Sequence, residues 1–227
     1  MRGVIIGFLL LLALSSGASS AVLFEDNFDD PTISQSWTVR QSFNGWSATE
    51  GAGIEVQTNR AVSGTTAHSG DQYIELDSDT SRGGIDGKAT NSKMSRLFEY
   101  GSGRYKLEFY YLPRTNKIGD NGIDVWLNVG TSQNIGGVDG LRRNFEDWAL
   151  QSYTFDVPTG QPTWELSLSA GGTSNEYGGF VDSLSLSRVS GNTQAIPAPA
   201  TLVLMFFGLI WTGLFRWYRR PRGSNAS

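Results

Sequence analysis

The segment Arg104-Tyr-Lys-Leu-Glu-Phe-Tyr-Tyr-Leu112 decides the fold class of this chain. Apolar and polar side chains alternate along it, and successive side chains of a β-strand point to opposite faces. One face carries Tyr105, Leu107, Phe109 and Tyr111, and the other carries Lys106, Glu108 and Tyr110. The alternation therefore predicts a strand with one apolar and one polar face.

The same alternation recurs in the segments 123–129, 164–168 and 180–186. In the first of these, Ile123, Val125, Leu127 and Val129 alternate with Asp124, Trp126 and Asn128. Further strands are expected at 22–26, 54–57, 73–78, 95–100 and 153–157, whereas no window between residues 22 and 194 keeps a helical period. The pattern predicts an all-β domain over residues 22–188, an antiparallel jelly-roll-type sandwich of two packed sheets.

Composition narrows the class of protein. Of the 227 residues, 39% are hydrophobic and 18% are charged, which indicates one folded domain rather than a disordered chain. Residues 22–193 hold all 22 acidic residues but only 13 of the 18 basic ones. A nucleic-acid partner, whose phosphates need lysine and arginine, is therefore not expected. The absence of cysteine excludes disulfides and cysteine-based zinc sites, and the single histidine, His68, excludes a multi-histidine metal site.

The first 21 residues have the features of a secretory signal peptide. Arg2 precedes an uncharged apolar run from Val4 to Leu14, and small residues stand at Ser19 and Ala21. This order predicts export and cleavage by signal peptidase after Ala21. An uncleaved membrane anchor is the alternative.

A second apolar segment lies near the C-terminus. No charge occurs from Ala198 to Phe215, and a helix over about residues 199–216 is long enough to cross a bilayer. A basic cluster follows it and is expected to stay on the cytoplasmic side, so that the domain faces outward; its members are Arg216, Arg219, Arg220 and Arg222. Residues 189–196, mostly small and polar, are expected to form a flexible linker. A buried core helix is the alternative.

The tail from residue 197 to residue 222 resembles the PEP-CTERM sorting signal of Gram-negative bacteria. It has the same parts in the same order, namely Pro197-Ala198-Pro199, one hydrophobic span and an arginine cluster. The resemblance implies a precursor held in the inner membrane with its domain in the periplasm. An exosortase would then cut near the prolines and pass the protein to the cell surface or the extracellular polymer. Ala198 stands where the family usually has glutamate, and a permanent single-span anchor is the alternative.

Short phrases across residues 22–188 resemble the galactose-binding-like β-sandwiches, in particular the secreted DUF642-like proteins and carbohydrate-binding modules. These phrases are the stretches 24–29, 53–57, 70–78, 105–114, 121–125 and 178–186. The resemblance implies a non-catalytic binding module that often carries one structural calcium ion. Its ligands would be Asp182 and Glu25, with Asp26 or Asp77 as further ligands.

Asp182 also stands out by its position in the alternation. It shares a predicted face with Phe180, Leu184 and Leu186, which would turn its carboxylate inward. A buried carboxylate is costly unless it is paired, hydrogen-bonded or bound to a metal. Calcium, which takes oxygen ligands, is one interpretation. Backbone N–H donors at the end of the strand are the other.

Aromatic residues at exposed positions indicate a carbohydrate platform. Tyr110 and Trp126 have Asp124 and Asn128 as polar neighbours, and a flat ring beside hydrogen-bonding groups can stack on a sugar. Alternatively, these rings pack under loops or against Arg114. The other tryptophans are expected to be core or loop anchors, and they include Trp37, Trp46, Trp148 and Trp164.

Catalytic signals are weak. No nucleophile elbow, phosphate loop or metal-hydrolase motif occurs in the sequence. We therefore expect an exported, tail-sorted surface or matrix protein that is not an enzyme. Its sandwich would bind carbohydrate or have a structural role in extracellular polymer. A glycan-active enzyme on the same sandwich and a purely adhesive, permanently anchored protein are the alternatives.

Overall fold

The computed structural model describes residues 21–189 of the chain. The predictions for the signal peptide and for the tail, including Pro197, Ala198, Pro199 and the arginine cluster, fall on residues outside this part. Within residues 21–189, no helix is long and apolar enough to cross a membrane.

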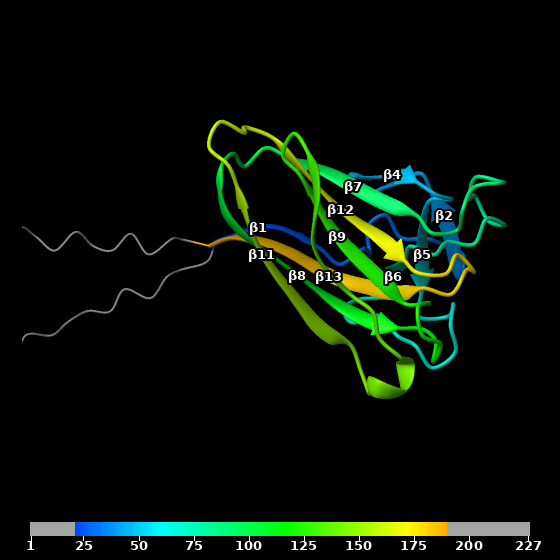
Figure 1. The fold of residues 1–227 in the computed structure, drawn as a ribbon. Coiled ribbons are helices and arrows are strands. Elements are labelled where there is room, and N and C mark those ends of the chain that lie inside the picture. The colour runs from blue at the N-terminus through cyan, green and yellow to red at the C-terminus, as the bar shows by residue number, and fades with distance from the viewer. Residues whose placement is uncertain (1–20, 190–227) are drawn as a thin grey trace, which may run out of the picture. The chain divides into compact units, whose positions relative to one another are not determined.

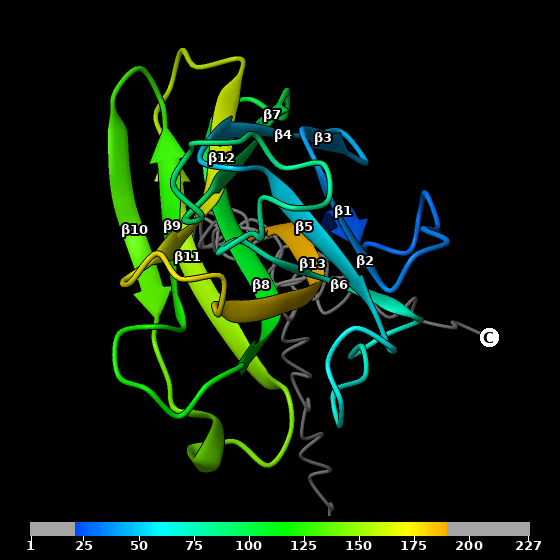
Figure 2. The same cartoon turned by 90° about the vertical axis from the view of Figure 1, so that its right-hand side faces the viewer.

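Two antiparallel sheets form the domain (Figures 1 and 2). Sheet A has the order β11 (Ala149–Val157), β8 (Gly103–Pro113), β13 (Gly179–Arg188), β6 (Gln72–Glu75), β5 (Ile54–Thr58) and β2 (Trp37–Arg40), and β1 (Ala21–Asp26) also pairs with β13. Sheet B has the order β10 (Ser132–Val138), β9 (Gly122–Asn128), β12 (Trp164–Gly171), β7 (Lys93–Phe98), β4 (Trp46–Glu50) and β3 (Ser42–Phe43). A short 3₁₀ helix, Arg142–Asn144, precedes β11. The predicted all-β sandwich is confirmed.

Every predicted strand is present, with shifted ends, but the alternation did not identify β2, β3, β4 or β10. The last of these contains two glycines and no apolar alternation. The hairpin between β3 and β4 turns at Asn44-Gly45, where both residues have a positive φ. Asn-Gly is the residue pair that a tight hairpin turn favours, so this signal was available in the sequence.

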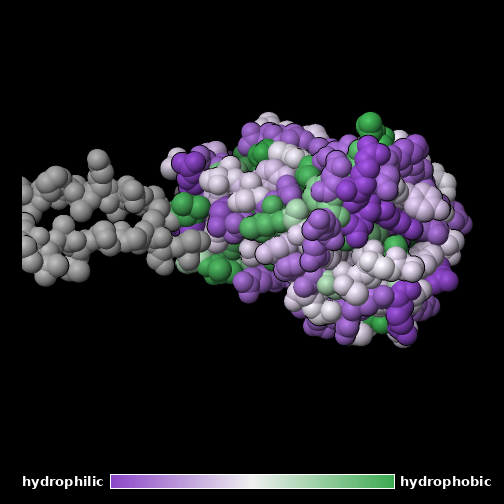
Figure 3. Space-filling view, turned by 90° about the horizontal axis from the view of Figure 1, so that it is seen from below, coloured by the Kyte–Doolittle hydropathy of each residue, from purple (hydrophilic) through white to green (hydrophobic). Residues whose placement is uncertain are grey.

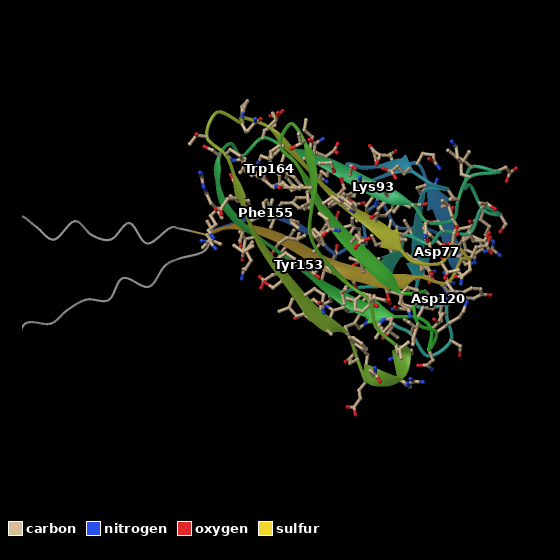
Figure 4. The ribbon with its side chains drawn as sticks, viewed as in Figure 1. Asp77, Lys93, Asp120, Tyr153, Phe155 and Trp164 are labelled. Atoms are coloured by element: carbon tan, nitrogen blue, oxygen red, sulfur yellow. The ribbon has the colours of Figure 1, made fainter. Side chains whose placement is uncertain are left out.

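The core fills the space between the two sheets. The apolar faces predicted for β8 and β9 are buried there, as Leu107, Phe109, Val125 and Leu127 illustrate. Figure 4 shows Trp164 and Phe155 close together at one end of the sandwich, where their ring centroids are 5.5 Å apart. In contrast, the surface in Figure 3 is mostly hydrophilic, and its hydrophobic residues form small separate groups.

A β-bulge in β13 overturns the predicted orientation of Asp182. The register with β8 shifts between Asp182 and Ser185, and Ser183 has a φ of 49°. Val181 and Leu184 therefore both contribute to the core between the sheets, although they are three residues apart. Asp182 points to the outer side of sheet A, away from the face of Leu184 and Leu186. The parity argument was wrong because alternation along a strand fails across a bulge.

Candidate ligand-binding cleft

A row of polar side chains lies on the outer face of sheet A. Glu55 and Gln57 of β5 alternate with inward-facing Ile54 and Val56, and Glu75 alternates in the same way on β6. Glu55 lies opposite Glu75 in the strand register, and Gln57 lies opposite Trp37 of β2. The pairing thus brings residues from three strands onto one patch.

Loops surround this patch and leave a small cavity. The cavity has a volume of about 100 Å³. Its lining, which we call the cleft, consists of Trp37, Glu55, Gln57, Ala61, Val62, Asp79, Arg114, Glu176 and Tyr177. Because the loops cover the sheet here, Glu55 and Gln57 are buried although they lie on an outer face.

Arg114 and Gln57 hold two buried carboxylates in place. Arg114 Nη1 donates to both carboxylate oxygens of Glu75, at 2.9 and 2.7 Å. Gln57 Nε2 bridges the two acids, with 2.7 Å to Glu55 and 2.5 Å to Glu75. The backbone N–H of Gly178 also donates to Glu75, and that of Asp79 donates to Glu55 at 2.7 Å.

Burial changes the acidity of this pair. It raises the pKa of Glu55 to about 7, against the hydrogen bonds from Asp79 and Gln57. Burial also raises the pKa of Glu75, the charge of Glu55 raises it further, and Arg114 opposes both effects. Glu55, whose pKa lies near neutrality and which no arginine contacts directly, can therefore exchange a proton near neutral pH.

Two aromatic rings and one unpaired acceptor complete the cleft. The Arg82 guanidinium lies 4.4 Å from the centre of the Trp37 ring, and that of Arg114 lies 4.6 Å from the Tyr177 ring. Tyr177 is 51% exposed. Gln57 Oε1 is buried and has no hydrogen-bond partner among residues 21–189. Chemically, the cleft offers ring faces, acceptors and a fixed cation to a ligand with several polar groups.

Asp77, predicted as a calcium ligand, positions the loop that carries Tyr177. Its carboxylate accepts hydrogen bonds from the backbone N–H groups of Asn175 and Tyr177, both at 3.1 Å, and from the Thr90 hydroxyl. Figure 4 shows Asp77 at the end of the sandwich opposite to Trp164.

The other three predicted calcium ligands lie along β1 and the bulge of β13. Glu25 and Asp26 line one cavity of about 470 Å³ together with Ser183, the residue that follows Asp182. However, no three acidic or histidine side chains of residues 21–189 converge as a metal site would require. Asp26 instead accepts a bond of 2.9 Å from the Trp46 indole. Within residues 21–189, the structure thus gathers the predicted ligands into no group of three, and calcium binding beside β1 stays a prediction.

Asp182 is satisfied by backbone donors, as the alternative interpretation expected. Its carboxylate accepts N–H bonds from His68 at 2.7 Å, Ser69 at 3.1 Å and Ser183 at 2.5 Å. Burial raises the pKa of Asp182 to about 7, despite these bonds, and Asp29 raises it further. Asp182 thus fastens the loop around His68 to the outer face of sheet A.

The predicted joint platform of Tyr110 and Trp126 is wrong, because their strands belong to different sheets. Tyr110 faces outward on β8 in sheet A, where His68 covers it with ring centroids 3.4 Å apart. Trp126, Asp124 and Asn128 do share the outer face of β9, but in sheet B. The Trp126 indole donates to Ser169 at 2.9 Å. Ligand binding at this second face stays a prediction.

The residues of the cleft were missed although their alternation was visible. Glu55, Gln57 and Glu75 stand at outward positions of predicted strands, where a polar side chain normally signals solvent. Only the adjacency of β5 and β6 and the loops above them make these residues a buried group. Two acidic residues and a glutamine on one outward face were the only signal in the sequence.

Comparisons with known proteins support the fold. No model of a protein family matches the sequence, and no curated protein matches it. The K2 cleaved adhesin domain of Lys-gingipain aligns with a TM-score of 0.51 at 13% identity, over 72% of this chain and 98% of that domain. A cyclase from Fischerella sp. TAU also aligns with a TM-score of 0.51 at 13% identity, over 76% of this chain and 100% of the other. At this identity, both likenesses show a shared β-sandwich fold alone.

A third solved structure is the CBM22-1 xylan-binding domain of Paenibacillus barcinonensis Xyn10C. It aligns with a TM-score of 0.43 at 11% identity, over 78% of this chain and 99% of that domain.

Proposed function

We propose that the sandwich is a non-catalytic carbohydrate-binding module, and that the cleft is its binding site. The observation that carries this proposal is the combination of Trp37 and Tyr177 with the hydrogen-bonding groups of Gln57, Glu55 and Arg114 in one cavity. Sugars present both C–H faces, which stack on aromatic rings, and hydroxyl groups, which need donors and acceptors. The cleft provides both kinds of contact.

Affinity electrophoresis in gels that contain soluble polysaccharides tests this proposal. We expect one class of polysaccharide to slow the protein, and we expect Trp37→Ala and Tyr177→Ala to restore its mobility. Trp126→Ala, on the opposite sheet, is the matched control and should keep the retardation. If Trp126→Ala alone restores mobility, the binding site lies on sheet B and the cleft is not the site.

A glycan-active enzyme is the second candidate, because Glu55 has a pKa near neutrality in a cleft with another carboxylate. Glycosidases use two carboxyl groups that both reach the scissile bond. Here Glu75 is fully buried and bonded to Arg114 and Gln57, so only Glu55 faces a ligand. This favours binding over turnover. The enzyme would become the better candidate if a bound glycan gave new reducing ends or unsaturated products and Glu55→Gln abolished them.

We further propose that the protein is exported and sorted by its tail. The support is the sequence of residues 1–21 and 197–222. Intact-mass analysis of the protein from cells and from medium is the test. We expect a mature start at Val22 and loss of the chain after about Pro197. A retained tail would indicate a permanent anchor instead. A purely adhesive role would give a surface or biofilm defect on deletion without retention by any glycan.

One structural calcium ion stays a prediction from the family resemblance. Its support is the proximity of Glu25 and Asp26 to the cavity beside Asp182. A rise in the thermal midpoint with millimolar calcium, abolished by Asp182→Asn, would establish the ion. An unchanged thermal midpoint would show that the predicted calcium ion does not bind.

A further inference from the structure

We propose that the ligand of the cleft is a glycan with free amino groups, so that a sugar ammonium enters the cavity. This inference rests on the proposed carbohydrate-binding function and narrows it to one chemical class. It is carried by the charges of the cleft, by an unpaired buried acceptor and by the size of the cavity.

The cleft holds more negative than positive charge. Three acidic side chains, Glu55, Asp79 and Glu176, line it with one basic residue, Arg114. A second cation, Arg82, lies over the ring of Trp37. The bonds of Arg114 Nη1 already go to Glu75 and to the carbonyl of Glu176. Within residues 21–189, neither Asp79 nor Glu176 forms an ion pair.

The negative charges of these carboxylates repel one another. Burial raises the pKa of Glu176, and the charges of Asp79 and Asp77 raise it further. An anionic ligand such as a uronic-acid polymer would add to this repulsion, whereas a cation would relieve it.

A buried acceptor points to the same ligand independently. Gln57 is only 1% exposed and lines the cavity, and both hydrogens of its amide nitrogen bond to the carboxylates of Glu55 and Glu75. Its Oε1 atom has no partner among residues 21–189. An unpaired buried acceptor is costly, so a ligand that donates an N–H here gains that free energy. An ammonium has three donors, enough for Gln57 and two carboxylates.

Size argues for a substituent rather than a whole sugar. The cavity of about 100 Å³ is small compared with the roughly 300 to 1,000 Å³ that is typical of pockets for whole ligands. An amino group enters it as a cation, whereas an acetamido group carries no charge to set against the carboxylates. The sugar ring itself would then lie outside, against the sides of Trp37 and Tyr177 that Arg82 and Arg114 do not cover. A lysine side chain would fill the cavity but leave the flat rings without a flat partner.

Titration calorimetry on the full-length protein with four probes tests the inference. The probes are the tetramer of glucosamine, the tetramer of N-acetylglucosamine, cellotetraose and polylysine. We expect the glucosamine tetramer to bind about tenfold more tightly than the other two sugars. Raising the salt from about 0.05 to about 0.5 M should reduce this preference.

Variants locate the effect in the cleft. The double variant Asp79→Asn, Glu176→Gln should lose most of the preference for glucosamine. Asp86→Asn, which changes an exposed aspartate of the neighbouring loop, should keep it. Circular dichroism spectra of both proteins would show that they are folded.

Each other outcome overturns the inference in a distinguishable way. If the neutral tetramers bind as tightly as the glucosamine tetramer, and Trp37→Ala abolishes this binding, the cleft binds sugars but does not select amino groups. If none of the three tetramers binds, this inference fails, and affinity electrophoresis with other polysaccharides then decides whether the proposed function fails as well. If polylysine binds and the sugars do not, the partner is a basic protein.

Discussion

At the scale of single residues, Glu75 is an acidic residue that the fold removes completely from solvent. It is fully buried beside a second acid, and Arg114 is its only ion-pair partner among the described residues. Breaking a buried ion pair by removing one partner is strongly destabilising, because the remaining charge stays away from water. Arg114 therefore serves the fold as well as the cleft.

We expect Arg114→Met to lower the free energy of unfolding by about 3 kcal/mol near pH 8. The loss should be smaller near about pH 5, because Glu75 can then take up a proton. Urea unfolding at both pH values measures this. Lys88→Met, which removes an exposed cation outside the ion pairs of residues 21–189, is the control and should change little. Equal losses at both pH values would mean that Glu75 does not titrate.

Glu55 should make the domain less stable as the pH rises. Its pKa of about 7 in the folded protein lies above the ordinary 4.5, so the folded state holds this proton more tightly than the unfolded chain. Stability is then lost between about pH 4.5 and pH 7, by up to about 3 kcal/mol. In Glu55→Gln this contribution is absent, so the slope of stability against pH should be shallower. A steeper slope in the variant would contradict the assignment.

At the scale of elements, the loops on sheet A determine what its outer face can do. The segment before β6 turns at Gly70, which has a φ of 70°, and lies directly against Asp29. Asp29 in turn accepts the backbone N–H groups of Asp71 and Gln72, at 2.8 and 2.9 Å. A side chain at Gly70 would displace this carboxylate and the start of β6 with it.

We expect Gly70→Ala to destabilise the domain by about 2 kcal/mol more than Gly64→Ala. Both glycines have a positive φ, so both variants carry similar backbone strain. A Cβ at Gly64 would meet no atom within 4 Å, whereas a Cβ at Gly70 would overlap Asp29. Thermal unfolding of the two proteins isolates the overlap, and equal midpoints would show that Asp29 moves away at no cost.

Elements also explain which predictions from the sequence succeeded. Regular alternation sufficed for β8, β9 and β12, because each keeps one face on the core along its whole length. It failed at β13, where one extra residue reverses the faces beyond Asp182. Alternation also could not predict that the cleft residues lie together. It gives the face on which a residue lies, but neither the sheet of its strand nor the strand beside it.

At the scale of the whole molecule, a polar bond joins the two sheets through the core. Trp46 of β4 donates its indole N–H to Asp26 of β1 at 2.9 Å. Trp164 is equally buried, but its indole nitrogen has no partner among residues 21–189. The two tryptophans thus form a matched pair with and without a hydrogen bond across the sandwich.

We expect Trp46→Phe to lower the free energy of unfolding by about 1 to 3 kcal/mol more than Trp164→Phe, because it removes a hydrogen-bond donor from the buried carboxylate of Asp26. Denaturant unfolding followed by circular dichroism gives both values. If the two substitutions are equally costly, the bond between Trp46 and Asp26 adds nothing beyond packing.

The pairing of β1 with β13 fixes where attached material can sit. Ala21 lies opposite Arg188, so the chain enters and leaves the domain at the same end of β13. Tyr177 stands two residues before the other end of that strand, and ten residues of strand span roughly 30 Å. A fusion partner or sensor surface joined directly at Ala21 or Arg188 would therefore attach at the end of the domain remote from the cleft, with the ligand side unobstructed.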